Sequence, residues 1–253
     1  MVRFLPLLST SYGGGPPAKG RLRHPCHVPR STNPAKPAAQ GRRSRRFKIT
    51  PLGDAALYVE LGQRVDTALN SRAIKLAGLL QARRDVREAI AGYASVVVHY
   101  DPEQITARGL VAAIQKLFGT RADSVPPGRL HRIPVFYDGP DLEETAQALE
   151  LSPEKLIKLH SEATYRCFMV GFVPGWAFLG PLPERLRLPR RKVPRKAVPP
   201  GSVAIATAQT GIYPLPSPGG WHLIGRTEVK VLLPNSDPPC LLRTGDRIRF
   251  FPA

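Results

Sequence analysis

The chain has 253 residues, 42% of them hydrophobic, so it can bury a substantial core and is long enough for two modest domains. Its 28 prolines and 22 glycines follow no period, which excludes a collagen-like fibre, and no run of about 18 apolar residues predicts a membrane span. The net charge of +18 suggests nucleic-acid binding, but ten of the 37 Lys and Arg residues and no acid lie within residues 1–46. The rest is only mildly basic, and we predict a globular protein that binds neither nucleic acid nor a membrane.

Residues 1–46 combine Pro, Gly, Ser and Arg without acids or apolar periodicity, so we expect a disordered basic tail. Three interpretations are open: a transit-like presequence, a tail for nucleic acid or a membrane surface, and a translation start assigned too far upstream. The fragment from His24 to His27 offers three metal donors but no fourth, so we predict no metal site.

The three cysteines, Cys26, Cys167 and Cys240, are isolated from one another and form no C-x-x-C pair. An odd number of scattered cysteines argues against a disulfide framework and indicates a reducing compartment. We therefore expect a cytoplasmic protein.

From Phe47 to about Pro126 the sequence predicts a small α/β unit. Apolar and β-branched runs predict strands, and apolar residues at helical spacing predict helices. In chain order, we expect a strand at Ala55–Leu61, a helix at Asp66–Arg84, strands at Val86–Tyr93 and Ser95–Tyr100, and a helix from Pro102 to Phe118 that Gly119 ends. The order β–β–α–β–β–α is typical of a ferredoxin-like α+β layer, and Val125–Gly128 is a candidate linker.

The remaining chain changes from helical to strand patterns. Leu130–Tyr137 is an expected strand that could return to either domain, Asp141–Leu149 is an expected helix, and Ser152 caps another that runs through Ser161. After Tyr165 the helical periodicity stops. Short expected strands then alternate with turns, as in an all-β barrel, at Val203–Thr207, Glu228–Leu233 and Asp246–Phe250.

Two Gly, Pro and aromatic clusters flank a basic loop between Gly171 and Thr227. Glycine allows close backbone approach and proline stiffens a loop, so these segments predict rigid loops that present side chains to a ligand or partner. Five charges among residues 190–196 are either solvated surface or an anion site, for which arginine is well suited. The polar groups of Gln209–Pro214 and Ser217–His222 are either structural turns or a binding site.

His160 shares an apolar helix face with Leu156 and Ile157. A histidine in such a place is either a satisfied core residue or a group that assists proton transfer. The sequence contains no P-loop, no G-x-S-x-G elbow and no H-E-x-x-H helix, so a hydrolase that works alone is hard to assemble from it.

Long segments of the chain resemble the KipI / allophanate hydrolase subunit 1 family, which includes a component of bacterial 5-oxoprolinase. The resemblance covers Phe47–Ala253, which favours a mis-assigned start as the explanation of residues 1–46. It implies an α+β protein with a ferredoxin-like domain at residues 47–128 and a cyclophilin-like β-barrel domain at residues 129–253. The matching segments include Gly171–Gly180, Leu188–Ala206, Gln209–Thr227 and Leu241–Phe250.

The resemblance implies a cytoplasmic, non-ATPase subunit of a 5-oxoprolinase-type complex, which opens 5-oxo-L-proline to L-glutamate with ATP. The implied partners are a KipA-like subunit of the allophanate hydrolase subunit 2 family and a third, LamB/YcsF-like subunit. The chain itself would carry no cofactor, and ATP would be used by the complex. Two alternatives are an allophanate hydrolase or urea carboxylase-type carboxyltransferase component, and a KipI-like inhibitor of a histidine kinase.

We expect the barrel loops to supply this chain's half of a shared site. Arg190 and Arg195 are predicted to hold an anionic group, and His160 to assist proton transfer. The predicted catalytic residues are His160, Gln209, Tyr213 and His222. The predicted substrate-binding residues are Arg190, Arg195, Thr210, Ser217, Gly219, Gly220, Trp221 and Arg226.

Overall fold

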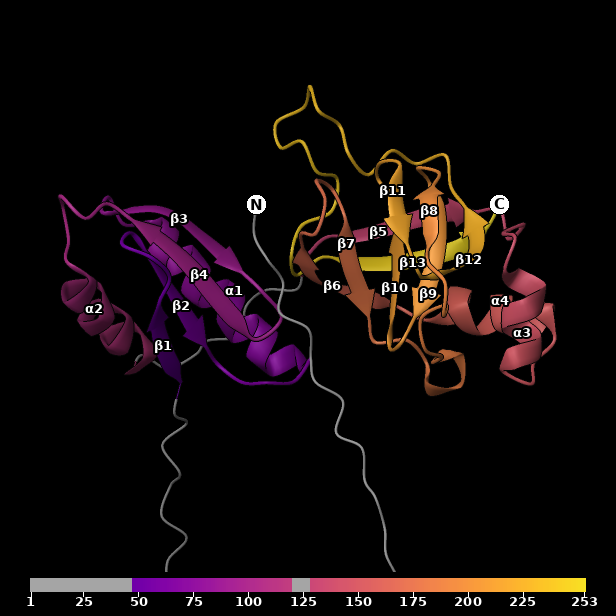
Figure 1. The fold of residues 1–253 in the computed structure, drawn as a ribbon, viewed down its shortest axis with the longest axis horizontal. Helices are drawn as coiled ribbons and strands as arrows, with labels where there is room; N and C mark the ends of the chain where they lie inside the picture. Colours follow the sequence, from indigo (N-terminus) through magenta and orange to yellow (C-terminus); the bar gives the residue numbers. More distant parts are fainter. Residues whose placement is uncertain (1–46, 120–127) are drawn as a thin grey trace, which may run out of the picture. The chain divides into compact units, whose positions relative to one another are not determined.

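The structure is a computed structural model, and it describes residues 47–119 and 128–253 (Figure 1). The predictions made for residues 1–46, including the fragment from His24 to His27, lie outside the described residues. The same holds for all but the last residue of the candidate linker Val125–Gly128.

The first part of the fold is a four-stranded antiparallel sheet with two helices. Its strands lie in the order β1-β2-β4-β3, so that β4 sits between the two strands that α1 connects (Figure 1). The predicted order of elements is confirmed. The elements are β1 (Lys48–Pro51), β2 (Ala56–Glu60), α1 (Thr67–Gln81), β3 (Val86–Ala91), β4 (Ser95–Tyr100) and α2 (Ala107–Gly119).

The two helices begin where side chains cap their free N–H groups. The Asp66 carboxylate accepts the N–H of Leu69 at 2.9 Å, so α1 begins directly after it. The helix predicted from Pro102 begins only at Ala107. The Asp101 carboxylate binds the N–H of Glu103 and closes a separate turn, after which the Thr106 hydroxyl accepts the N–H of Gly109 at the true start of α2.

The apolar side chains of this sheet and its helices form one core. Val59, Val96 and Val98 from the strands pack with Leu80 and Ile114 from the helices, and all five are fully buried. The alternation of β2 and β4 and the helical spacing of α1 and α2 therefore serve the same interior.

The second part is a seven-stranded sheet in the order β12-β9-β10-β7-β6-β13-β5, beside a two-stranded ribbon of β8 and β11 (Figure 1). Strand β5 lies parallel to β13, which places the predicted strand Leu130–Tyr137 in this sheet. The elements are β5 (Leu130–Val135), α3 (Leu142–Ala148), α4 (Pro153–Glu162), β6 (Tyr165–Val170), β7 (Ala177–Gly180), the 3-10 turn η1 (Glu184–Leu186), β8 (Arg195–Val198), β9 (Ser202–Ala206), β10 (Gln209–Ile212), β11 (Ser217–Gly219), β12 (His222–Arg226) and β13 (Arg247–Pro252).

The two outer strands of this sheet meet and nearly close it into a barrel. Phe136, just after β5, and Arg226, at the end of β12, exchange backbone hydrogen bonds of 2.8 Å in both directions. Gly225 makes this approach possible, because a Cβ atom there would lie 2.5 Å from the Phe136 carbonyl oxygen. The barrel predicted from the short strands is confirmed, and its interior is filled by apolar residues such as Ile133, Leu179 and Phe250.

One predicted strand is wrong. Residues 228–233 form no strand: Val231 is buried and Val229 packs beside it, while Leu232 makes a single bridge to Cys240. The alternating pattern arises because this loop inserts every second side chain into the barrel core without joining a ladder of hydrogen bonds. Strands β6, β7, β8, β10, β11 and β12 had not been predicted.

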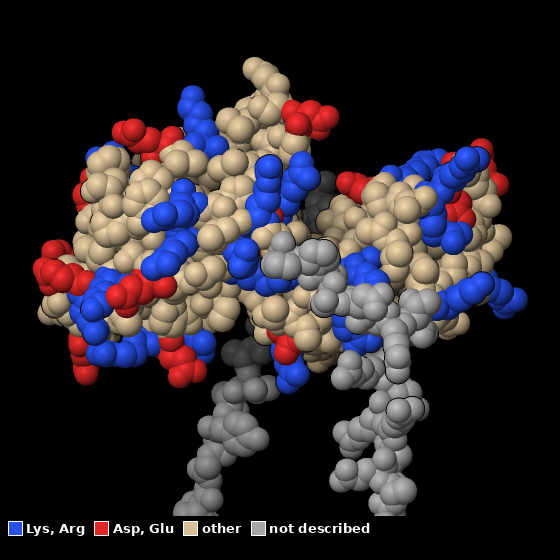
Figure 2. Space-filling model, turned by 180° about the vertical axis from the view of Figure 1, so that it is seen from behind, with Lys and Arg blue, Asp and Glu red and all other residues tan. Residues whose placement is uncertain are grey.

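The surface of the described residues is mixed in charge. Figure 2 shows one face, on which Lys and Arg side chains lie among Asp and Glu side chains and uncharged surface. No helix within residues 47–119 and 128–253 is both long enough and apolar enough to cross a membrane.

Candidate functional site

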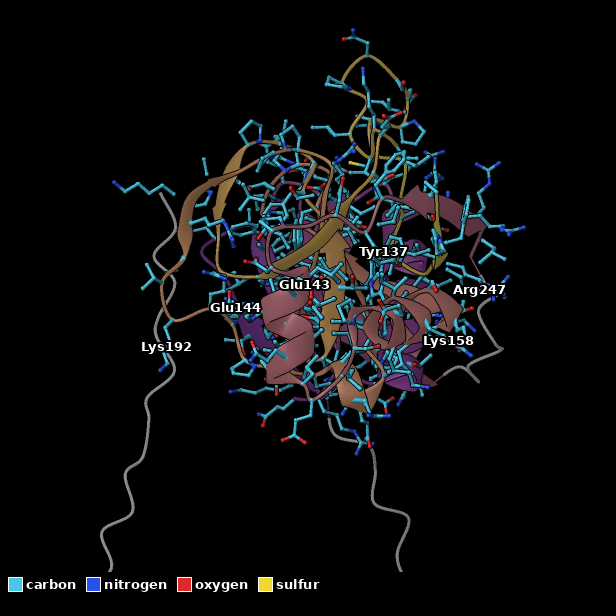
Figure 3. The ribbon with its side chains drawn as sticks, turned by 90° about the vertical axis from the view of Figure 1, so that its right-hand side faces the viewer. Tyr137, Glu143, Glu144, Lys158, Lys192 and Arg247 are labelled. Atoms are coloured by element: carbon cyan, nitrogen blue, oxygen red, sulfur yellow. The ribbon has the colours of Figure 1, made fainter. Side chains whose placement is uncertain are left out.

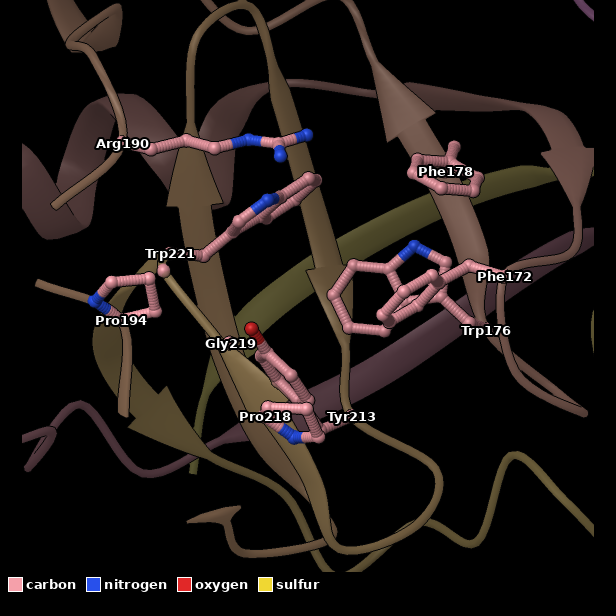
Figure 4. A pocket seen from close by; sticks show the side chains of 10 residues that line it. Phe172, Trp176, Phe178, Arg190, Pro194, Tyr213, Pro218, Gly219 and Trp221 are labelled. Atoms are coloured by element: carbon pink, nitrogen blue, oxygen red, sulfur yellow. The ribbon is translucent and has the colours of Figure 1, made fainter. Parts of the chain in front are cut away.

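A pocket of about 250 Å³ lies where the ribbon of β8 and β11 meets the loop before β7 (Figure 4). Most of its wall is aromatic ring or proline, with one cation at the rim. It contains five of the predicted site residues. The lining residues are Phe172, Trp176, Phe178, Arg190, Pro194, Tyr213, Pro218, Gly219, Gly220 and Trp221.

Trp176 forms the rigid centre of this wall. It is only 2% exposed, and its ring meets those of Tyr213 and Trp221 edge-to-face, with ring centroids 4.6 and 5.0 Å apart. Phe178 packs against both tryptophans at 5.8 and 6.4 Å. Edge-to-face packing of this kind stabilises a fixed arrangement of rings, so the wall is formed before any ligand arrives.

Phe172 stands at the rim in the opposite condition. Its side chain is 66% exposed, and its backbone has a φ of 77°, a region that residues with a side chain rarely adopt. Gly175, at φ 80°, completes the turn that carries it. An exposed aromatic residue on a strained backbone is typical of a binding surface rather than of a core.

The basic loop is held to the pocket by its backbone. The His222 ring donates from Nε2 to the Pro189 carbonyl oxygen at 2.9 Å, and the N–H of Arg191 donates to the Gly220 carbonyl oxygen at 2.8 Å. Arg190 lies between these two anchors and extends above Trp221 (Figure 4). The predicted catalytic residue His222 is therefore placed as an anchor for the loop, and its Nδ1 atom is buried without a partner among the described residues.

Arg195 does not face the pocket as predicted. Its guanidinium makes two hydrogen bonds with the carboxylate of Asp141, one of them 2.6 Å long, and Arg191 adds a third bond of 2.8 Å. The backbone N–H of Leu223 also donates to this carboxylate at 2.7 Å. The anion that Arg195 binds is thus the protein's own, and its role is structural.

Asp141 is nearly inaccessible, with 2% of its side chain exposed. Burial opposes its ionisation, but the hydrogen bonds from Arg195 and Leu223 and the charges of Arg195 and Arg191 outweigh burial and hold the pKa of the carboxyl below its usual value. The carboxylate ties α3 to the basic loop and to β12, so it fixes the position of the loop that supplies Arg190 to the pocket.

Tyr213 and Gly219 form the pocket wall opposite Arg190. Burial raises the pKa of Tyr213, although the backbone N–H of Trp221 and the charges of Arg190 and Arg195 oppose this shift, so the phenol stays protonated at neutral pH. A Cβ atom on Gly219 would collide with the Tyr213 hydroxyl. Only glycine therefore fits at this position.

His160 and Thr210 lie inside the barrel and away from the pocket. Thr210 donates its hydroxyl hydrogen to the Ala204 carbonyl oxygen and so accepts the Nε2–H of His160 at 3.0 Å. The His160 Nδ1 atom then accepts from the hydroxyl of Tyr137, which is labelled in Figure 3, at 2.8 Å. Both ring nitrogens are satisfied within the core, so the core interpretation of His160 holds, and neither residue is placed to act on a ligand in the pocket.

The burial of His160 leads to a prediction about pH. Burial lowers the pKa of His160 to about 3, whereas the same side chain titrates near 6.5 when it is exposed. The unfolded chain therefore takes up a proton that the folded chain does not, and stability should fall as the pH decreases from about 6.5 towards 3. NMR titration should show this ring neutral at pH 5, with its signal assigned by its loss in His160→Gln. A midpoint between pH 6 and 7 would contradict this account.

The other predicted residues are dispersed. Gln209 donates from Nε2 to the Tyr93 hydroxyl at 2.7 Å, and Arg226 pairs with Asp138 at 2.9 Å beside the barrel closure. Ser217 is buried, does not line the pocket, and its hydroxyl has no partner among the described residues. The structure thus brings together Arg190, Tyr213, Gly219, Gly220 and Trp221.

The predicted residue set omitted half of the pocket. Phe172, Trp176 and Phe178 had been recognised only as an aromatic loop that either lines a pocket or caps a turn, and Pro194 and Pro218 only as stiffening residues. Asp141 had no signal beyond its place at the start of a helix. Within residues 47–119 and 128–253, no group of three His, Cys, Asp or Glu residues is placed to hold a metal ion.

The sequence and the fold are similar to those of known proteins. Residues 47–242 match the family model described as carboxyltransferase domain, subdomain C and D. The chain is 40% identical over 204 residues to the 5-oxoprolinase B subunit of Escherichia coli O157:H7, which covers 79% of this chain and 94% of that protein. It is 35% identical over 221 residues to the protein of the same name in Bacillus subtilis (strain 168), which covers 81% and 92% respectively. The crystal structure of TTHA0988 matches 78% of this chain with a TM-score of 0.72 and 41% identity, and this chain spans 40% of that chain's length.

Proposed function

Because the chain belongs to the family of carboxyltransferase domains, subdomains C and D, we propose that it is the B-type subunit of a 5-oxoprolinase. The observation that carries the proposal is its similarity to curated 5-oxoprolinase B subunits along more than nine-tenths of their length. Such an enzyme hydrolyses the ring amide of 5-oxo-L-proline to L-glutamate. We propose that the reaction uses ATP and takes place in the cytoplasm, where Cys167 and Cys240, both free thiols, would stay reduced.

We further propose that this chain is inactive alone and completes a site with a KipA-like subunit and a LamB/YcsF-like subunit. The pocket has aromatic walls and a cation, but the titratable residues predicted for catalysis lie elsewhere or serve as anchors. The exposed apolar side chains of Phe172 and Val193, 66% and 77% accessible, support a partner surface beside the pocket. ATP would bind to another subunit, since this chain has no phosphate-binding loop.

We also propose that the two sheets belong to separate domains, a ferredoxin-like layer at residues 47–128 and a cyclophilin-like barrel at residues 129–253. The position of β4 between β2 and β3 supports the first assignment. The near-closure of the second sheet through Phe136 and Arg226 supports the second.

The proposed function is tested by reconstitution. The purified chain should release no glutamate from 5-oxo-L-proline, whereas a mixture with both partner subunits and ATP should do so. Leaving out this chain should abolish the activity. Glutamate release that is unchanged without it, or turnover of allophanate in place of 5-oxo-L-proline, would refute the proposal.

A further inference from the structure

Arg190 differs from its neighbours in the basic loop. Arg191 and Arg195 both bind the Asp141 carboxylate, whereas Arg190 has no acidic partner within residues 47–119 and 128–253. Its backbone is nevertheless fixed on both sides, by the bond from His222 to the Pro189 carbonyl and by the bond from Arg191 to the Gly220 carbonyl. An unpaired guanidinium on an anchored backbone at a pocket rim is prepared to bind an anion, and a carboxylate matches its paired N–H groups.

The pocket wall contains a second unused donor. The indole Nε1 of Trp176 is buried and has no acceptor among the described residues. Figure 4 shows this nitrogen on the edge of the ring that faces Phe178. A buried N–H without a partner is unfavourable, so an oxygen acceptor brought by a ligand would remove a cost that the free protein carries.

The shape of the pocket limits what can enter. Its volume of about 250 Å³ lies below the ~300–1,000 Å³ usual for drug-sized ligands. Its walls are the flat rings of Trp176, Tyr213 and Trp221, which favour contact with another flat group. The occupant should therefore be small and planar, with an anionic group at one end.

We propose that this pocket binds a small planar cyclic amide that carries a carboxylate. The carboxylate pairs with Arg190, the ring packs between the aromatic side chains, and the amide oxygen accepts from Trp176 Nε1. This inference rests on the proposed function, under which the ligand is 5-oxo-L-proline, and it assigns the substrate-binding site to the barrel of this chain.

The chain offers a direct probe of this site. Its two tryptophans, Trp176 and Trp221, both line the pocket, so intrinsic fluorescence of the full chain reports on it. Titration with 5-oxo-L-proline should change the fluorescence, and Arg190→Gln should weaken binding about 10–100-fold because a charge-assisted hydrogen bond is lost. Lys192→Gln is the matched control: it removes a charge from the same loop at an exposed position (Figure 3), and binding should be unchanged.

Ligand analogues separate the two contacts. 2-Pyrrolidinone lacks the carboxylate, so it should bind weakly and equally to the wild type and to Arg190→Gln. L-Proline lacks the amide oxygen, so Trp176→Phe should not affect its binding. The same variant, with Trp221 as the remaining reporter, should weaken 5-oxo-L-proline binding about 5-fold or more. Analogues that respond equally to both variants would contradict the assigned orientation.

Kinetics of the reconstituted complex distinguish this inference from the proposed function. If the complex is active, Arg190→Gln should raise KM about 10–100-fold and change kcat little, since the contact binds the substrate as much as the transition state. A KM within two-fold of the wild type, with no fluorescence response up to about 10 mM ligand, would overturn the pocket assignment and leave the function intact. A complex that is inactive while the isolated chain binds 5-oxo-L-proline would refute the function alone.

Discussion

Replacing Asp141 with Asn should destabilise the protein by about 3–5 kcal/mol, the usual consequence of removing one partner from a buried ion pair. The carboxylate holds two guanidinium groups and the N–H of Leu223, with bonds between 2.6 and 2.8 Å. An amide of the same shape cannot neutralise Arg191 and Arg195, which would be left partly buried with unmatched charge. For a protein of this size, the midpoint of thermal unfolding should fall by about 6–20 °C.

Glu144→Gln is the matched control for Asp141→Asn. Glu144 approaches the same arginine, Arg191, at 3.4 Å, but its side chain is 69% exposed, so solvent screens the pair and its loss should change stability by about 1 kcal/mol or less. Calorimetry of both variants gives the comparison. If Asp141→Asn were no more destabilising than Glu144→Gln, the carboxylate would not be the anchor described here.

The contribution of Asp141 should depend on pH in a defined direction. The pKa of the carboxyl is lower in the folded chain than its ordinary value of 3.8, so folding favours the ionised form. The stabilisation is fully present above about pH 4 and is lost as the pH falls through the lowered folded value. The difference in stability between the wild type and Asp141→Asn should therefore shrink in strong acid.

Replacing Trp176 with Ala should cost about 3–5 kcal/mol, the range found when a large buried aromatic side chain is removed. The ring is 2% exposed and contacts Tyr213, Phe178 and Trp221, so its loss leaves a cavity in the smaller apolar cluster of the barrel. Urea unfolding followed by circular dichroism measures the change without relying on tryptophan emission.

Phe172→Ala is the control for Trp176→Ala. The two residues share one loop and one pocket, with ring centroids 6.3 Å apart, but Phe172 is 66% exposed. Its removal should change stability by about 0.5 kcal/mol or less. Similar losses in the two variants would mean that the ring of Trp176 is not the packed centre of the pocket wall.

The local sequence patterns predicted most of the helices and the first sheet, because these elements depend on short-range spacing and caps. The helix after Asp66 and the strand Ser95–Tyr100 were predicted correctly for this reason. Most barrel strands were missed, because β7, β8, β10 and β11 have only three or four residues, too few to show a period. The loop at Val231 shows the reverse error, an alternating pattern without strand pairing.

The candidate site divides in the same way. Rigid loops near Arg190 and Trp221 were predicted from glycine and proline, whose backbone effects are local. The sequence alone thus determined the family resemblance, the β-rich character of the second half and which loops carry unusual side chains.

Only the tertiary structure decided which of these side chains meet. Asp141 pairs with a residue 54 positions away and His160 with one 50 positions away, and no pattern within a short segment contains either contact. Both follow from the near-closure of the barrel, which places α3, α4 and the basic loop against distant strands. That closure removed Arg195 and His160 from the pocket and left Arg190 as its cation, because pairing and burial depend on neighbours in space rather than in sequence.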